Sequence, residues 1–115
     1  MANHVVIVGW NKPTAGREKQ AMKLFEKAMG LYVKWQNEGL IESFEPVLLS
    51  WHGGDLNGFV ILRGNAKKMA DLKSDDAWIE LVVESGYCLE NFGVVDGYTG
   101  DSMMKMFERY SKLIS

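Results

Sequence analysis

The chain alternates between short apolar runs and longer segments in which apolar residues recur every three or four positions. The runs His4–Trp10 and Phe59–Arg63 are rich in β-branched residues, which favours strands over helices. Neither run alternates cleanly between apolar and polar positions. Both faces of these two strands are therefore predicted to be covered, as in the middle of a sheet.

A long helix is predicted between the first two strands. Its apolar residues recur at steps of four and three, in the order Ala21, Phe25, Ala28, Tyr32 and Trp35. This spacing places one apolar stripe along the helix. Thr14 is the expected N-cap, and Gly39 is the expected C-cap because glycine accepts positive φ.

The remaining pattern predicts two more strands and three more helices. Pro46 removes a backbone donor, so its strand is placed at an edge of the sheet. The turn residues His52-Gly53-Gly54-Asp55 favour a hairpin after that strand. The expected elements are a strand over Leu40–Trp51, a short helix Ala66–Leu72 capped by Asn65, a helix from the N-cap Ser74 to near Gly86, a strand over Tyr87–Tyr98 and a helix over Asp101–Ile114.

This order of elements predicts an α+β fold. Two βαβ-like halves form a four-stranded antiparallel sheet with helices on one face and an additional C-terminal helix, all in a single domain spanning 1–115. The first and third strands are central. Trp35, Trp78 and the methionine-bearing last helix are interpreted as core. The second face of the sheet remains apolar, so we expect a homodimer in which two sheets pack face to face.

Three features of the chain are similar to the dimeric α/β-barrel superfamily, which has a ferredoxin-like βαββαβ topology. They are the strand followed by Lys12-Pro13, the helix break at Leu72-Lys73-Ser74-Asp75-Asp76 and the strand Gly93-Val94-Val95-Asp96-Gly97-Tyr98. The chain resembles antibiotic-biosynthesis monooxygenases, stress-responsive barrel proteins and YCII-like proteins. The resemblance implies the fold and the dimer, whereas the superfamily hosts several chemistries.

Composition narrows the classes of function. The chain has 115 residues, 47% of them hydrophobic, and a net charge of −2, which gives no general reason to bind nucleic acid or an anionic membrane. No apolar run approaches the roughly 20 residues of a membrane span, and no secretory signal is recognised. The single cysteine, Cys88, is interpreted as a structural thiol, with a nucleophile as the alternative. A cytoplasmic location is expected.

The candidate catalytic and anion-binding residues are isolated polar groups. His52, at the hairpin, and His4, at the start of the first strand, are candidate general bases, with a solvated histidine as the alternative. Arg63 can bind a carboxylate if it points between two sheets. Its alternative is to reach water or pair with Asp96. No metal-ligand spacing is present, so neither a metal nor a cofactor is predicted.

Aromatic residues suggest a pocket for a planar ligand. Trp10, Trp51 and Tyr98 can line it, or they can serve core or dimer packing. The resemblance implies Asn, Trp and Tyr or His in the pockets of cofactor-free monooxygenases, and Asn11 and Trp10 lie near the end of the first strand. Haem-degrading members carry a histidine on the second helical region. The absence of histidine from residues 66–85 argues against that activity.

Three functions remain open at this point. The first is a homodimer that binds a small, mostly apolar or aromatic molecule in a cavity. The second is a cofactor-independent monooxygenase or isomerase that uses His52 or His4 as its base. The third is a structural or interaction protein whose barrel interior is filled by side chains.

Overall fold

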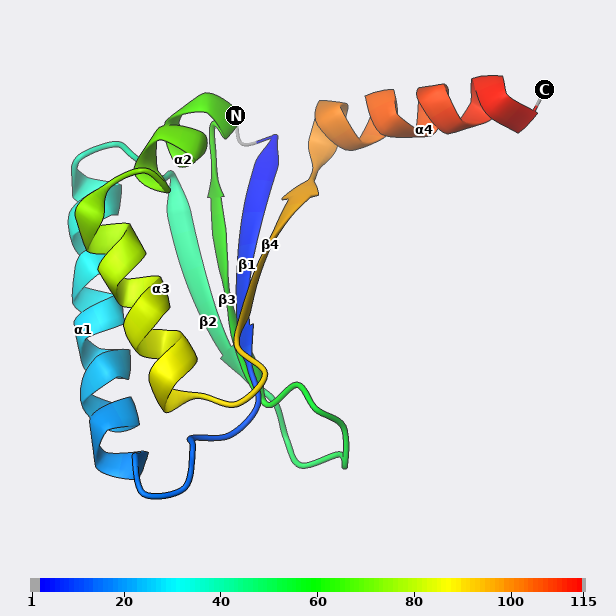
Figure 1. Cartoon of the computed structure of the whole chain (residues 1–115). Coiled ribbons are helices and arrows are strands. Elements are labelled where there is room, and N and C mark those ends of the chain that lie inside the picture. Colours follow the sequence, from blue (N-terminus) through cyan, green and yellow to red (C-terminus); the bar gives the residue numbers. More distant parts are fainter. Residues whose placement is uncertain (1–2, 115) are drawn as a thin grey trace.

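The computed structural model describes residues 3–114 and confirms the predicted α+β fold. Four strands form one antiparallel sheet in the order β2-β3-β1-β4. Helices α1 and α3 cover one face of this sheet, and the other face is open (Figure 1). The elements are β1 (His4–Trp10), α1 (Glu18–Asn37), β2 (Ser43–Leu48), β3 (Gly58–Gly64), α2 (Ala66–Leu72), α3 (Asp76–Cys88), β4 (Gly93–Tyr98) and α4 (Gly100–Ile114).

The core lies between the sheet and the two long helices. Alternate residues of the central strands face the helices, and Val6 and Leu62 pair across β1 and β3 with almost no exposed surface. Trp35 on α1 and Trp78 on α3 are buried, and their rings lie 5.9 Å apart. Both tryptophans therefore occupy the predicted core.

Several local predictions are confirmed. Pro46 stands on the edge strand β2, opposite Val60. Gly39 has a φ of +78° after α1, where the amide of Leu40 donates to the carbonyl of Trp35 at 2.9 Å. The side chain of Asn65 caps α2 by accepting a hydrogen bond from a backbone amide, 3.0 Å away.

The structure corrects three predicted boundaries. The first helix begins at Glu18, because residues 14–17 form a turn, and Thr14 does not cap it. The second strand is shorter than predicted and spans Ser43–Leu48. The N-cap of α3 is the residue after Ser74, and its side chain makes no capping hydrogen bond.

The largest correction concerns the segment predicted as a strand from Tyr87. Helix α3 continues to Cys88, and β4 begins only at Gly93. The buried residues of α3 explain the extension, because Leu81, Ser85 and Cys88 continue one helical stripe at steps of four and three. Gly86 lies on the exposed side of that helix and does not end it.

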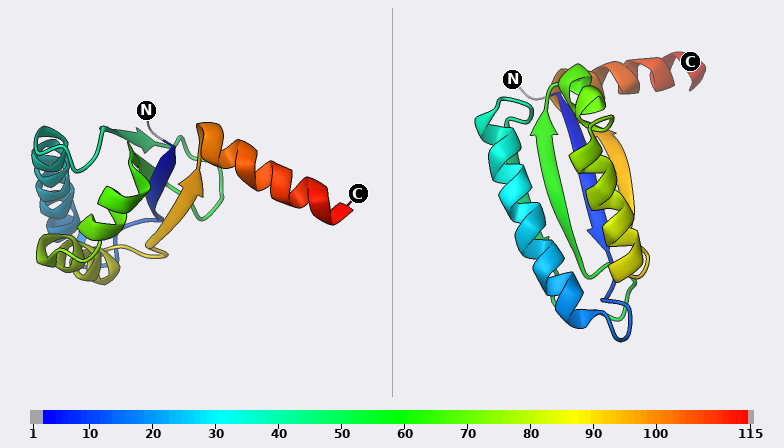
Figure 2. Two further views of the ribbon diagram at one scale, coloured as in Figure 1. Left: turned by 90° about the horizontal axis from the view of Figure 1, so that it is seen from above. Right: turned by 60° about the vertical axis from the view of Figure 1, so that its left-hand side comes forward.

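The prediction that the last helix belongs to the core is wrong, because α4 does not pack into the core of its own chain. It projects away from the rest of the molecule, on the side of the open sheet face (Figures 1 and 2). None of its residues, Gly100–Ile114, is buried. This projecting helix, called the arm below, contributes to a radius of gyration of 15.8 Å, compared with the ~13 Å typical of a compact chain of this length.

The open face of the sheet is apolar. The residues of β1, β3 and β4 that alternate with the core positions include Ile7, Phe59, Ile61 and Val95. Of these, Val95 leaves 60% of its surface exposed. Among residues 3–114, no helix is long and apolar enough to cross a membrane.

Candidate ligand-binding cavity

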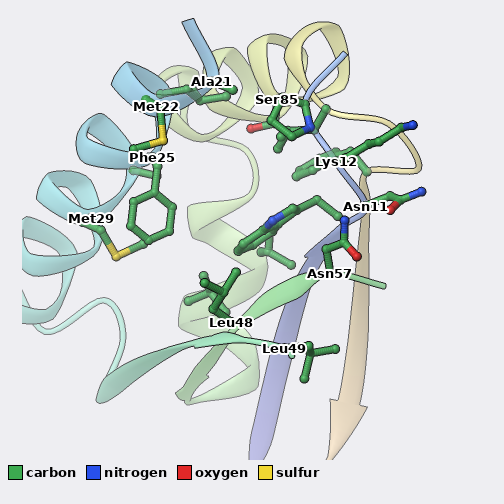
Figure 3. Close-up of a pocket in the computed structure, with 18 of the residues that line it drawn as sticks. Asn11, Lys12, Ala21, Met22, Phe25, Met29, Leu48, Leu49, Asn57 and Ser85 are labelled. Carbon is green, nitrogen blue, oxygen red and sulfur yellow. The ribbon is translucent and has the colours of Figure 1, made fainter. Parts of the chain in front are cut away.

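A cavity of about 740 Å³ lies between the first half of α1 and the end of the sheet where β1 and β2 finish (Figure 3). Such a volume falls within the range of ordinary small-molecule sites. Met22, Phe25 and Met29 from α1 form one side of the cavity, and Leu48 from β2 lies across from them. The walls are therefore mostly apolar.

Trp10 forms part of the cavity wall at the end of β1. Its ring meets that of Phe25 edge to face, with centroids 6.4 Å apart. Trp10 also pairs with Gly58 on the neighbouring strand. A Cβ atom at Gly58 would lie 2.7 Å from Cζ2 of Trp10, so glycine leaves the space in which the indole lies against the sheet.

One side of the cavity is polar. Asn11, Lys12 and Asn57 lie together on the side opposite α1 (Figure 3). Backbone hydrogen bonds fix the positions of the two asparagines: the amide of Asn57 donates to the carbonyl of Trp10 at 2.8 Å, and the amide of Asn11 donates to the carbonyl of Glu90 at 2.9 Å. Lys12 is exposed at this rim and forms no ion pair with another residue of the range 3–114.

The hairpin loop between β2 and β3 carries the mouth of the cavity. Trp51 and His52 both line the cavity, and Trp51 is fully exposed. Leu48 and Met22 also line it and are 83% and 66% exposed, so apolar side chains surround the opening. Such exposed apolar surface is typical of a site that receives a ligand or a partner.

The imidazole of His52 is held by its own loop. The amide of Gly54 donates to Nδ1 at 3.1 Å, which leaves Nε2 as the donor to the carbonyl of Leu56 at 2.7 Å. Both ring nitrogens are thus engaged by backbone groups. A role as general base requires the loop to release one of them, so the geometry indicates that His52 shapes the loop.

Tyr32 is a buried polar residue of the cavity wall, with only 2% of its surface exposed. Burial raises the pKa of its phenol to about 12, because the charged phenolate is poorly solvated there. The phenol therefore stays neutral at physiological pH and can act as a hydrogen-bond donor to a ligand.

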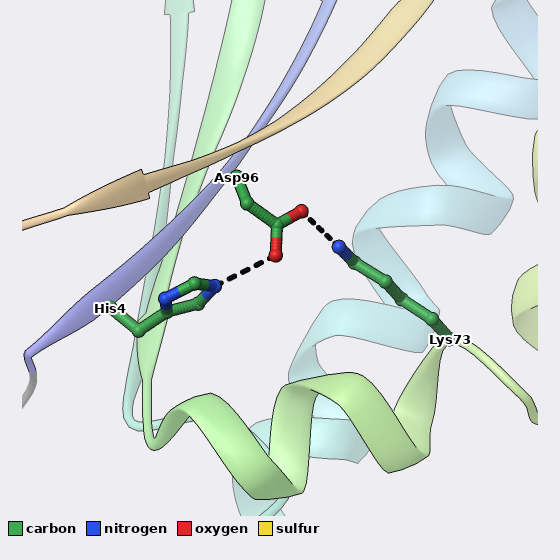
Figure 4. Close-up of polar contacts among 3 residues, drawn as sticks. All are labelled: His4, Lys73 and Asp96. Carbon is green, nitrogen blue, oxygen red and sulfur yellow. Dashed lines mark hydrogen bonds and ion pairs between the residues drawn. The ribbon is translucent and has the colours of Figure 1, made fainter.

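His4 and Tyr98 lie at the opposite end of the sheet from this cavity. His4 Nε2 is 2.8 Å from Asp96 Oδ2, and Asp96 also pairs with Lys73 (Figure 4). Tyr98 packs edge to face with His4, with ring centroids 6.1 Å apart. Burial alone would raise the pKa of Asp96, but the hydrogen bonds and charges of Lys73 and His4 lower it below its usual value.

Arg63 lies on the open face of the sheet, opposite Val5. Its guanidinium pairs with Glu45 on the neighbouring strand, with Nη1 3.4 Å from Oε1. The alternative pairing with Asp96 is wrong, because Asp96 stands on the helix-covered face. Arg63 is therefore placed on the surface where a second sheet is expected, away from the cavity.

The structure thus brings together four of the predicted site residues, namely Trp10, Asn11, Trp51 and His52. It places the others, His4, Arg63 and Tyr98, elsewhere. The main cavity residues that sequence reasoning missed are Lys12, Asn57 and the α1 residues Met22 and Phe25. Phe25 belongs to the predicted apolar stripe, and nothing in that pattern separates a cavity wall from a filled core.

Neither metal-ligand nor thiol chemistry is indicated elsewhere. Within residues 3–114, no group of three or more His, Cys, Asp or Glu side chains is placed to hold a metal ion. Cys88 has no exposed surface, and burial raises the pKa of its thiol. Nearby Glu84 raises that pKa further, whereas Arg17 opposes the shift. These observations favour the structural interpretation of Cys88.

The fold is ferredoxin-like. A dimeric protein of unknown function with a ferredoxin-like fold from Bacteroides fragilis is similar to this chain, with a TM-score of 0.59 and 11% identity over 84% of this chain and 96% of that one. A protein from Agrobacterium tumefaciens aligns with a TM-score of 0.47 and 13% identity over 85% and 94% of the two chains. No family model matches the chain. No curated protein matches it either.

Proposed function

We propose that the chain forms a homodimer through the open face of its sheet and binds a small, mostly apolar molecule with an anionic group in the cavity beside α1. The observation that supports this class of ligand is the contrast between the apolar walls of the cavity and its one polar rim. Methionine and aromatic side chains suit a flat apolar body. Asn11, Asn57 and the ammonium of Lys12, which pairs with no acid among residues 3–114, suit a carboxylate.

The sheet supports the dimer. Within residues 3–114, no helix or strand covers Ile7, Phe59 and Ile61 on the open face, and apolar surface of this kind is costly in water. The similar protein from Bacteroides fragilis is described as dimeric, which agrees with this proposal.

The ligand is tested with an aromatic anion and its uncharged counterpart, naphthoate and naphthamide. We expect naphthoate to raise the thermal midpoint more than naphthamide does. Lys12→Gln should weaken naphthoate binding by about fivefold, the effect of an exposed charge pair worth about 1 kcal/mol. Lys23→Gln is the matched control, because Lys23 is exposed on α1 and does not line the cavity. Equal binding of both probes to all three proteins would contradict the proposed ligand class.

The dimer is tested by placing a charge on the open face. Ile61→Lys should convert the dimer to a monomer in sedimentation experiments, because a lysine cannot be buried there without a partner. Ile79→Lys is the control, since Ile79 is 46% exposed on α3, away from the sheet. A wild-type monomer at micromolar concentration would refute the dimer and leave the ligand proposal standing.

No reaction is proposed. His52 has both ring nitrogens engaged by its loop, and His4 is paired with Asp96 at the other end of the sheet. A cofactor-independent oxygenase or isomerase therefore has no specific support from the placement of its candidate bases. The cavity itself favours binding over a barrel that serves assembly alone.

A further inference from the structure

Helix α4 has an apolar side and a polar side, and neither is buried against another element among residues 3–114. Its apolar residues recur at steps of three and four and form one stripe: Met103, Met106, Phe107, Tyr110 and Ile114. Phe107 and Tyr110 are 56% and 61% exposed. An amphipathic helix of this kind gains most of its stability by packing its apolar side against a surface, so the stripe requires a partner.

The direction of α4 identifies the region that it reaches. It leaves the end of β4 and runs outward on the open side of the sheet (Figures 1 and 2). Its 15 residues extend over about 22 Å, whereas two stacked sheets lie only about 10 Å apart. If a second sheet covers the open face, α4 therefore spans the layer of that sheet and continues to the level of the helices behind it.

Strand directions then determine which edge of the partner the arm meets. All three strand pairs are antiparallel, so the two edge strands, β2 and β4, run in opposite directions. A two-fold axis parallel to the strands places β4 of one protomer beside β2 of its partner, in antiparallel orientation. An axis across the strands would instead place each edge strand beside its own copy and bring the arm to β4 and α3 of the partner, so the site at which the arm docks distinguishes the two arrangements. We take the first arrangement.

We infer that α4 of each protomer docks on a second copy of this chain, across the edge of β2 and onto the neighbouring side of α1. This inference rests on the proposed homodimer. An axis parallel to the strands leaves α4 at the end of the sheet where β2 begins, so the receiving surface is the second half of α1 and its connection to β2. There Val33 is 48% exposed and Leu40 is partly exposed.

The area that the arms bury is consistent with a stable dimer. Aromatic side chains bury about 150–250 Å² each, so the exposed halves of Phe107 and Tyr110 alone contribute about 200 Å² per arm. Two arms exchanged reciprocally double that area and add it to the sheet interface. Specific interfaces require about 1,200–2,000 Å² in total, and a pair of four-stranded sheets joined by two arms can provide it.

Cysteine cross-linking tests the arm in the intact protein. In Leu113→Cys/Val33→Cys, one cysteine lies near the tip of the arm and the other on the exposed surface of the second half of α1. We expect a short bismaleimide to convert the purified dimer to a covalent dimer. The control is Leu113→Cys/Val83→Cys, because Val83 is 68% exposed on α3, and α3 lies away from the β2 edge. Cys88 is fully buried, so the wild type provides the background.

The outcomes separate this inference from the dimer itself. Cross-linking through Val33→Cys and not through Val83→Cys supports the arm. Equal cross-linking of both pairs, or none in a protein that sediments as a dimer, overturns the docking site and leaves the sheet-to-sheet dimer standing. If the wild type sediments as a monomer, both proposals fall. A chain that ends at Thr99 provides a second measurement, and its dimer should dissociate at least tenfold more readily than the full chain.

Discussion

Filling the cavity should separate its role in binding from its role in stability. Ala28 is partly buried on α1 and lines the cavity without occupying it. The substitutions Ala28→Leu and Ala28→Phe extend a side chain into this space. Both are expected to abolish binding of an aromatic ligand while leaving the fold intact.

The expected change in stability follows from the area that the new side chain buries. Leucine adds three carbon atoms, and each fully buried methylene contributes about 0.8 kcal/mol. Because the cavity opens to solvent and its walls are fixed, the new side chain gains only part of the free energy of full burial. We therefore expect an increase of about 0.5–2 kcal/mol in the free energy of unfolding. The thermal midpoint should then rise by several degrees.

The assay is a thermal unfolding curve with and without naphthoate. Ala70→Leu, on the exposed side of α2, provides the matched control and should retain the ligand-induced shift. Loss of the shift in a stabilised Ala28 variant supports a cavity kept open for a ligand. An Ala28→Phe protein that is folded and binds naphthoate as well as the wild type would refute the assignment of the site. A destabilised Ala28→Leu protein would show that the space is already filled.

Three further predictions follow from single contacts. In urea titrations the wild type should lose about 1–3 kcal/mol of stability between pH 10 and 12. The pKa of Tyr32 is raised to about 12 in the fold, so ionisation favours the unfolded chain as the pH rises. Tyr32→Phe should remove this loss. The wild type should lose stability as the pH falls below ~4, because the lowered pKa of the half-exposed Asp96 carboxyl stabilises the fold only while that group is ionised. Asp96→Asn should reduce this loss in the free energy of unfolding by less than about 1 kcal/mol. Gly58→Ala should cost about 1–3 kcal/mol in chemical denaturation, because its Cβ would meet the ring of Trp10 at 2.7 Å, whereas Gly86→Ala, with open space around its Cβ, should be neutral or stabilising.

The fold was predictable because its signals are local and agree with one another. Pro46 indicates an edge strand, Gly39 ends a helix with positive φ, and Asn65 caps the next helix. Errors arose where two local signals competed. Tyr87 and the glycine before it suggested the start of a strand, but the buried stripe through Ser85 and Cys88 extends the helix over them.

The cavity was only partly predictable. Trp10 and Trp51 were identified because aromatic residues at strand ends often line pockets, and both do line this one. Tyr98 has the same kind of sequence context and lies at the other end of the sheet, because β4 runs antiparallel to β1. The sequence does not single out Lys12 as a ligand-binding residue, because the role proposed for it depends on the absence of a nearby acid in the described structure and on the loop that places Asn57 on the same side of the cavity.

The two faces of one strand explain how binding and assembly can coexist in so short a chain. Along β1, Val8 and Trp10 point toward the cavity and the core, whereas Ile7 points to the open face. Because side chains alternate strictly, a shift of one residue in the register would exchange these two sets. The requirement for apolar residues at both sets of positions is why the strand looks uniformly hydrophobic in the sequence. A uniform run of this kind therefore indicates that two surfaces need covering. Here helices of the same chain cover one face, and the other is the face through which we propose that a second copy binds.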